Sequence, residues 1–136
     1  MNRIVQLRSA RDGTTISLSN FVPENGSPTS ESFLVSISNY ELKAETRASS
    51  YMAPNLHQYF ASMASEWQGW KGEKTWATLE GEFELKATVD STGHVRLAYF
   101  LRPPYTDFHW ELRGAIEIEV GQLEAIAAEF QAAWPA

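Results

Sequence analysis

Cysteine is absent from the 136 residues, which excludes a disulfide, a thiolate zinc site and a cysteine nucleophile. Long apolar runs are absent as well. No run approaches the length of about eighteen apolar residues that a transmembrane helix needs. The first residues, MNRIVQLRSARDG, also lack the apolar stretch of a signal peptide. We therefore expect a cytoplasmic protein without a membrane partner.

Basic side chains are scarce. The chain has 11 Lys and Arg against 17 Asp and Glu, for a formal charge of -6. A nucleic-acid binder needs a basic surface to displace counterions, so this balance argues against that class. It is compatible with a basic protein partner. With 43% hydrophobic and 21% charged residues, the composition is typical of one globular domain spanning residues 1–136, either a monomer or a homodimer.

Sequence motifs of catalysis are missing too. There is no Gly-x-Ser-x-Gly elbow, no glycine-rich phosphate loop and no helical zinc motif. We therefore predict no catalytic residue, no metal ligand and no cofactor. The pair Asp90 and His94 has two interpretations. It is either a general-base arrangement or a turn histidine bonded to a neighbouring aspartate.

Alternating apolar residues predict two hairpins in the first third of the chain. Asp12-Gly13 is a two-residue turn signal, which would pair Arg11 with Thr14 and place Leu7 opposite Leu18. A second two-residue turn near Asn39 would bring the next two apolar sets to one face. These sets are Phe33, Val35 and Ile37, followed by Tyr40, Leu42, Ala44 and Thr46.

Two amphipathic helices are predicted from apolar residues at helical spacing. Pro54 suits the first turn of the first helix, and Gly69 is a plausible end for it. Its stripe is Leu56, Tyr59, Phe60, Met63 and Trp67. Residues 122–134 form the second helix, which Gly121 can cap. Its stripe is Leu123, Ile126, Ala127, Phe130 and Trp134.

Three further strands are predicted between the helices. Residues 79–90 alternate almost perfectly, and Ser91-Thr92-Gly93 fits a three-residue hairpin that pairs Asp90 with His94. This register places Val89 opposite Val95 and Phe83 opposite Leu101. A third strand follows the loop after Pro103-Pro104. The expected fold is α+β, with about seven antiparallel strands in one or two sheets. The order is ββββ-α-βββ-α, with the helices packed on one face.

Acidic residues gather on the outward positions of these last strands. They are Glu80, Glu82, Glu84, Glu111, Glu117 and Glu119. Three interpretations of this face are open. It is a solvated sheet surface whose negative charge is partly offset by cations, or a docking surface for a basic protein, or it holds a pair of glycosidase carboxylates. The cations are Lys86, Arg96, Arg102 and Arg113.

Three of the five tryptophans (Trp67, Trp70 and Trp76) fall inside ten residues. We predict that Trp67 and Trp76 are core anchors that join helix to sheet. Trp70 lies in a loop between glycines, beside Lys71 and Glu73, and is either a core residue or an exposed hot spot for a partner.

The pattern Trp67-x-Gly69-Trp70-x-Gly72-x-x-x-Trp76 continues with Leu79-Glu80-Gly81, then Gly93-His94-Val95, then Gly121-Gln122-Leu123. Over residues 56–130 the chain resembles a family of small bacterial proteins of unknown function. Members of that family tend to carry arginine where this chain has Gln68 and Lys74. The family is similar in size and layout to immunity proteins of bacterial polymorphic-toxin systems. The resemblance implies an intracellular protein that binds a toxin domain, and it supplies no catalytic residue.

The sequence thus predicts a non-enzymatic, immunity-like protein that binds a basic, toxin-like partner through the acidic face or the tryptophan loop. The candidate partner-binding residues are Trp70, Lys71, Glu73, Glu80, Glu82, Glu84, Glu117 and Glu119. The alternative is a small-molecule binder or enzyme with a pocket between sheet and helix. A third interpretation is a structural or oligomerisation module.

Overall fold

The computed structural model describes residues 3–27, 29–104 and 110–135, and within these ranges eight strands form two antiparallel sheets. The first sheet contains β1 (Val5–Arg8), β2 (Thr15–Pro23), β3 (Glu31–Ser38) and β4 (Lys43–Ser49) in chain order. The second contains β5 (Lys74–Ala77), β6 (Phe83–Val89), β7 (His94–Leu101) and β8 (Leu112–Glu119), also in chain order. Helix α1 (Leu56–Ser65) connects the sheets, and α2 (Leu123–Ala133) follows a 3-10 turn, η1 (Val120–Gln122).

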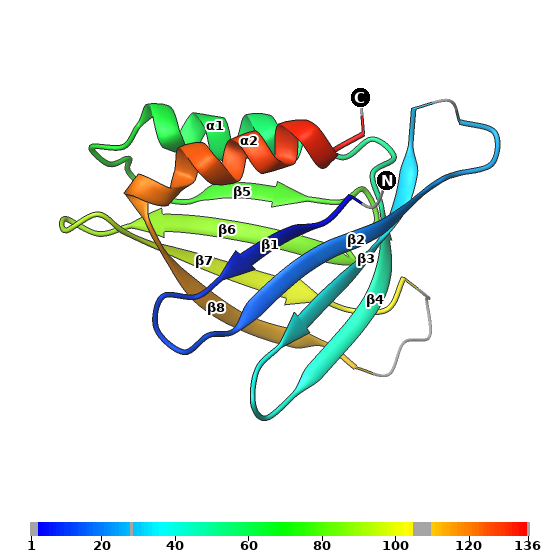
Figure 1. The fold of residues 1–136 in the computed structure, drawn as a ribbon, viewed down its shortest axis with the longest axis horizontal. Helices are drawn as coiled ribbons and strands as arrows, with labels where there is room; N and C mark the ends of the chain where they lie inside the picture. Colours follow the sequence, from blue (N-terminus) through cyan, green and yellow to red (C-terminus); the bar gives the residue numbers. More distant parts are fainter. Residues whose placement is uncertain (1–2, 28, 105–109, 136) are drawn as a thin grey trace.

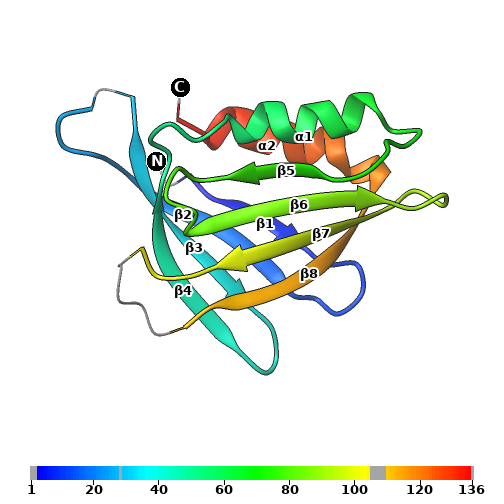
Figure 2. The same cartoon turned by 180° about the vertical axis from the view of Figure 1, so that it is seen from behind.

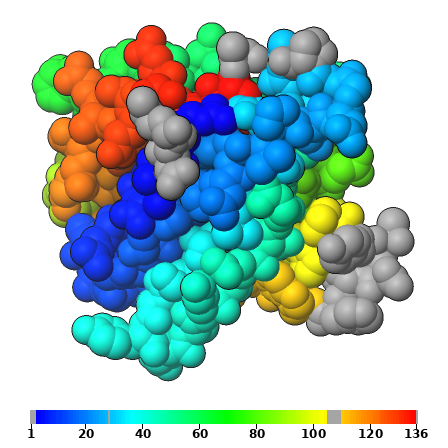
Figure 3. Space-filling model, turned by 45° about the vertical axis from the view of Figure 1, so that its right-hand side comes forward, coloured from blue at the N-terminus to red at the C-terminus, as the bar shows by residue number. Residues whose placement is uncertain are grey.

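The two sheets cross one in front of the other, and both helices lie along the side where β1 and β5 are found (Figures 1 and 2). Figure 3 shows the first sheet, coloured blue to cyan, beside the orange-to-red C-terminal helix. All these elements share one apolar core. Phe60 of α1 stacks on Phe130 of α2 with ring centroids 5.0 Å apart. Trp134 meets Phe33 of the first sheet and Trp76 of the second edge-on.

Helix α1 begins where the side chain of Asn55 accepts the backbone N–H groups of His57 and Gln58. Its predicted stripe is buried from Leu56 to Met63, but the prediction for Trp67 is wrong. The helix ends at Ser65, before Gly69, so Trp67 leaves the stripe and is 59% exposed. The stripe of α2 is confirmed, since all five of its predicted members are buried.

The two predicted two-residue turns are both longer in the structure. After β1, the backbone N–H of Ser9 donates to the carbonyl of Thr14, and the carboxylate of Asp12 accepts the N–H of Thr14. Leu7 consequently lies opposite Ile16, not Leu18. Because the shift is two residues, the apolar set still faces the core.

The second longer turn lies between β3 and β4. There the side-chain oxygen of Asn39 accepts the N–H groups of Glu41 and Leu42. Tyr40 and Leu42 are therefore exposed at the tip of the hairpin. The predicted alternation begins only at Ala44, which lies opposite Ile37.

The prediction of about seven strands missed β5, a four-residue strand in which Trp76 supplies the buried side chain. The segment from Leu79 to Gly81 is the turn between β5 and β6 and not part of a strand, so Leu79 is 52% exposed. The predicted register of β6 on β7 is confirmed, from Phe83 opposite Leu101 to Val89 opposite Val95.

Hydrogen bonds join the sheets at two seams. At one seam, Glu117 in β8 accepts the N–H of Ala10 through its carbonyl and donates its own N–H to the hydroxyl of Ser9. The loop after β1 is thereby fixed against the edge of β8. At the other seam, the carboxylate of Glu82 accepts the N–H of Ser49, at the end of β4.

Candidate functional site

The outer face of the second sheet carries charges of both signs. In register across β6, β7 and β8, Glu84 lies beside Phe100 and Arg113, and Lys86 lies beside Ala98 and Ala115. The next two rows are Thr88, Arg96 and Glu117, then His94 and Glu119. The predicted acidic face is thus divided. Carboxylates gather at the end marked by Glu117 and Glu119, and cations gather around Ala98.

The acidic end consists of Asp90, Glu117 and Glu119, arranged around His94. The Nδ1 atom of His94 lies 2.7 Å from Oγ1 of Thr92 and 3.3 Å from Oδ2 of Asp90. Its Nε2 atom lies 3.2 Å from Oε1 of Glu119. Both ring nitrogens therefore face oxygen atoms, and the imidazole bridges the β6–β7 turn to β8.

The turn that Asp90 occupies stabilises the ionised form of its carboxylate. The backbone N–H of His94 and the hydroxyl of Thr92 lower the pKa of Asp90 to about 2, because both donate to its carboxylate. Asp90 is therefore ionised at neutral pH, and its side chain is 55% exposed. The predicted contact between Asp90 and His94 is confirmed. The Asp90 carboxylate also stabilises the hairpin turn, because it accepts hydrogen bonds from Thr92 and from the N–H of His94.

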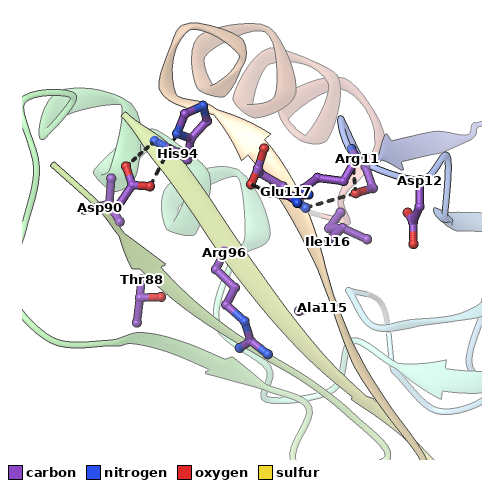
Figure 4. A pocket seen from close by; sticks show the side chains of 11 residues that line it. Arg11, Asp12, Thr88, Asp90, His94, Arg96, Ala115, Ile116 and Glu117 are labelled. Atoms are coloured by element: carbon purple, nitrogen blue, oxygen red, sulfur yellow. Dashed lines mark hydrogen bonds and ion pairs between the residues drawn. The ribbon is translucent and has the colours of Figure 1, made fainter. Parts of the chain in front are cut away.

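A groove of about 560 Å³ runs beside this end, between the outer face of the sheet and the loop after β1. Arg11 reaches across it, with Nη1 3.5 Å from Oε1 of Glu117. Figure 4 shows Glu117 between His94 and Arg11, with the side chain of Arg96 pointing away from His94. The groove is thus lined by charges of both signs, with Asp12, Asp90 and Glu117 against Arg11 and Arg96.

The basic end consists of Lys86, Arg96 and Arg113, one residue from each of three adjacent strands. A hollow of about 390 Å³ lies among them, with Ala98 on its floor. The guanidinium of Arg113 lies 4.4 Å from the centre of the Phe100 ring.

One group of side chains at the acidic end has the donor types of a metal site. Ligand atoms of His94, Glu117 and Glu119 lie within 4.8 Å of one another. An imidazole with two carboxylates suits Zn²⁺ or Mn²⁺. In this structure, however, Glu117 is paired with Arg11, and Nε2 of His94 lies against Glu119.

A protein-family model described as "Family of unknown function (DUF6228)" matches residues 7–134. The chain belongs to DUF6228. This confirms the predicted membership of a family of unknown function. The match includes every residue named above for the acidic and basic ends, because they lie between Arg11 and Glu119. Searches among curated proteins and among solved structures gave no match. The toxin-binding role that the resemblance implies stays a prediction for this DUF6228 member.

The predicted partner-binding carboxylates do not form one surface. Glu82 is only 2% exposed, so its predicted outward orientation is wrong. Its side chain turns inward because it precedes β6 and ends the tight turn after β5. Glu80 is exposed in that turn, and Glu84 lies at the start of β6, at the opposite end of the sheet from Glu119. Of the predicted acidic set, the structure brings together Glu117 and Glu119.

The tryptophan loop is partly folded into the protein. Trp70 is half-buried, and its Nε1–H donates to the carbonyl of Ala87 at 3.3 Å. The ammonium of Lys74 lies 5.6 Å from the centre of the Trp70 ring and also pairs with Glu66. The side chains that remain exposed near this loop include Trp67, Lys71 and Glu73. His109 lies outside the described residues.

Sequence reasoning missed Arg11 and Asp12 as residues that line the groove. Both lie in the loop after β1, more than a hundred positions from Glu119 in the chain, and no local pattern places them beside β8. Only a correct prediction of the sheet arrangement could have placed Arg11 and Asp12 beside β8. An eight-stranded arrangement of two sheets brings the edge of β1 to the edge of β8, but that arrangement was not predicted.

No helix in the described part of the chain has the length and apolar character that crossing a membrane requires.

Proposed function

We propose that the protein is a non-enzymatic binding protein whose acidic end receives a basic segment of a protein partner. The observation that carries this proposal is the ion pair between Arg11 and Glu117. In the groove, the carboxylate of Glu117 already forms an ion pair with a guanidinium group, with Oε1 of Glu117 3.5 Å from Nη1 of Arg11. The Glu117 side chain is 25% exposed, and the Asp90 and Glu119 side chains are 55% and 46% exposed. An arginine or lysine of a partner would bind beside Arg11 or replace it.

Charge supports a basic partner over other classes. The net charge of -6 draws basic proteins toward this chain and repels nucleic acid. Carboxylates at an interface raise the association rate and select the partner, and those that become buried in charge pairs also slow dissociation. An immunity-like role follows from the same chemistry. A protein that presents ordered carboxylates can cover the surface with which a basic toxin, such as a nuclease, would bind phosphates.

The experiment measures affinity for the purified products of the genes adjacent to this one. Wild type is compared with E117Q/E119Q, and K86Q/R96Q on the same face is the matched control. We expect about tenfold or greater weakening for E117Q/E119Q and little change for the control, because truncating interfacial charge pairs raises the dissociation rate. Equal affinity of wild type and E117Q/E119Q for a product that binds would exclude the acidic end as the contact.

A small-molecule site is the second candidate, because the groove has about 560 Å³ and convergent polar groups, including His94, Asp90 and Glu117. It differs from the predicted pocket in place, since it lies on the outer face of the sheet and not between sheet and helix. A library of polar small molecules, tested by thermal shift on wild type and H94A, separates the two functions. A small-molecule shift that H94A abolishes would favour this candidate.

A further inference from the structure

We infer that the basic end is a separate binding site for a small molecule that carries a phosphate group or a comparable multivalent oxoanion. The inference does not rest on the proposed function, since its residues differ from those of the acidic end. It begins with sheet register. Lys86 lies directly opposite Ala98, and Arg96 lies two residues before Ala98 on the same face. Arg113 lies two residues before Ala115, the partner of Ala98 on β8.

The hollow exists because small residues occupy the centre of the face. Side chains on one face of a sheet stand at alternate positions, so long residues around a short one leave a depression. Ala98 presents only a methyl group between Lys86 on β6 and a second alanine, Ala115, on β8. The resulting space of about 390 Å³ is also lined by Phe100, Tyr99 and Gly114. Strands β6, β7 and β8, which contribute the cations, lie side by side in Figure 2.

The cations of this hollow outnumber its carboxylates. Among the residues that the structure describes, Lys86 and Arg96 form no ion pair and no side-chain hydrogen bond. Arg113 packs on Phe100. Glu84 is the one carboxylate in the lining, and its Oε2 leans toward Gly81, 3.3 Å from where a Cβ atom there would lie. Three cations against one carboxylate reverse the local sign on a chain of net charge -6.

This geometry favours a compact oxoanion. Guanidinium groups donate in a fork that matches phosphate oxygens, and an ammonium adds a point charge. Glu84 lies in the row on one side of the hollow and Glu117 in the row on the other side. These carboxylates would repel the successive phosphates of a nucleic acid but leave room for one anionic group. The ligand class is therefore a phosphorylated small molecule and not a polyanion.

The test titrates the full chain with pyrophosphate and with inorganic phosphate in chloride buffer, followed by NMR and by calorimetry. We expect saturable shifts of the amides of Ala98, Phe100 and Ala115. In K86Q/R96Q the affinity for pyrophosphate should fall about tenfold or more, because two charge-assisted contacts are lost. In E117Q/E119Q it should stay equal or rise. Lys86 and Arg96 are exposed, and Glu117 and Glu119 are half-buried, so unfolding curves are recorded to establish that both variants are folded.

A phosphorylated sugar added to the pyrophosphate complex should displace it from the same amides. The absence of saturable shifts with either anion would overturn the inference, as would equal affinity in wild type and K86Q/R96Q. Binding to vesicles of anionic lipid, with no response to the small anions, would overturn it as well. E117Q/E119Q is the control in this experiment and the test variant in the partner experiment. A negative result for anion binding therefore does not bear on partner binding, and a negative result for partner binding does not bear on anion binding.

Discussion

The carboxylate of Glu82 joins the two sheets, because its Oε2 accepts the backbone N–H of Ser49 at 3.0 Å. Its Oε1 accepts the hydroxyl of Thr78 at 2.5 Å. One buried side chain thus ties the end of β4 to the turn between β5 and β6. The chain has no cysteine to make such a link covalently.

Replacing Glu82 by alanine should lower the free energy of unfolding by roughly 1–4 kcal/mol, because an unsatisfied polar group costs about 1–3 kcal/mol. The change leaves the half-buried Ser49 N–H without this acceptor and leaves the buried Thr78 hydroxyl only the carbonyl of Phe83, 3.4 Å away. E82Q should lose less, since the amide oxygen can still accept one of the two bonds. Urea denaturation measures both changes. The control is E84Q, two residues further on and on the outer face of β6, with an expected change within about 0.5 kcal/mol. Similar losses for E82A and E84Q would show that the buried bonds do not stabilise the seam.

The buried position of Glu82 shows that alternation predicts side-chain orientation only within a strand. The period-two rule assigned the β6–β7 register correctly, because Ser91-Thr92-Gly93 fixes the hairpin and both strands are long. It failed at Glu82, because the rule holds only inside a strand and β6 begins at Phe83. It also failed at β5, where four residues are too few for a period to be visible.

The candidate site was predictable in pieces. The contact of Asp90 with His94 follows from the turn, and the outward orientation of Glu117 and Glu119 follows from alternation. Their proximity to Arg11 does not, because it depends on hydrogen bonds between residues more than a hundred positions apart. The N–H of Ala10 donates to the carbonyl of Glu117, and the N–H of Glu117 donates to the hydroxyl of Ser9. Charges on neighbouring strands separate into acidic and basic ends only once the register of β7 on β8 is known.

Gly114 should resist substitution because the Tyr99 ring lies over it. A Cβ atom at Gly114 would lie 2.3 Å from the Tyr99 hydroxyl oxygen and 2.6 Å from Cζ. G114A should therefore destabilise the protein by roughly 1–3 kcal/mol, the usual range for overpacking. The matched control is G121A, where a Cβ would meet nothing within 4 Å. Gly121 lies in η1, so alanine there should be neutral or add up to about 1 kcal/mol. Thermal unfolding of both variants checks this, and G114A as stable as G121A would contradict the contact.

Tyr59 should make the protein less stable at alkaline pH. Burial raises the pKa of Tyr59 above its usual value, with a further contribution from the charge of Glu73. In the unfolded chain the phenol ionises near about pH 10, before it does so in the folded state. The unfolded state then binds fewer protons, so the free energy of unfolding is steady below about pH 10 and falls above it.

The variant Y59F should flatten this fall. At neutral pH it should cost about 1 kcal/mol, because the Tyr59 hydroxyl donates to the carbonyl of Lys74 at 2.7 Å. Some alkaline dependence should remain, since burial also raises the pKa of Tyr99. Urea denaturation at a series of pH values measures the slope. Y40F, at the exposed hairpin tip, is the control and should reproduce the wild-type profile. A Y59F profile as steep as that of Y40F would refute the assignment.

Trp76 and Trp67 should differ sharply when truncated, although the sequence predicted both as core anchors. Trp76 is 3% exposed, donates its Nε1–H to the carbonyl of Pro54 at 2.7 Å, and meets Phe83 and Trp134 edge-on. W76A should lower the free energy of unfolding by roughly 3–5 kcal/mol. If W76A does not fold, W76F should remain folded with a smaller loss.

W67A should change stability by no more than about 0.5 kcal/mol, because the Trp67 side chain is 59% exposed beyond the end of α1. Chemical denaturation followed by circular dichroism compares the variants without relying on tryptophan fluorescence. A large loss in W67A would mean that this side chain is packed in solution. If W67A keeps its stability but loses affinity for a partner, the tryptophan loop belongs to the docking surface, because an exposed tryptophan contributes most where a partner buries it.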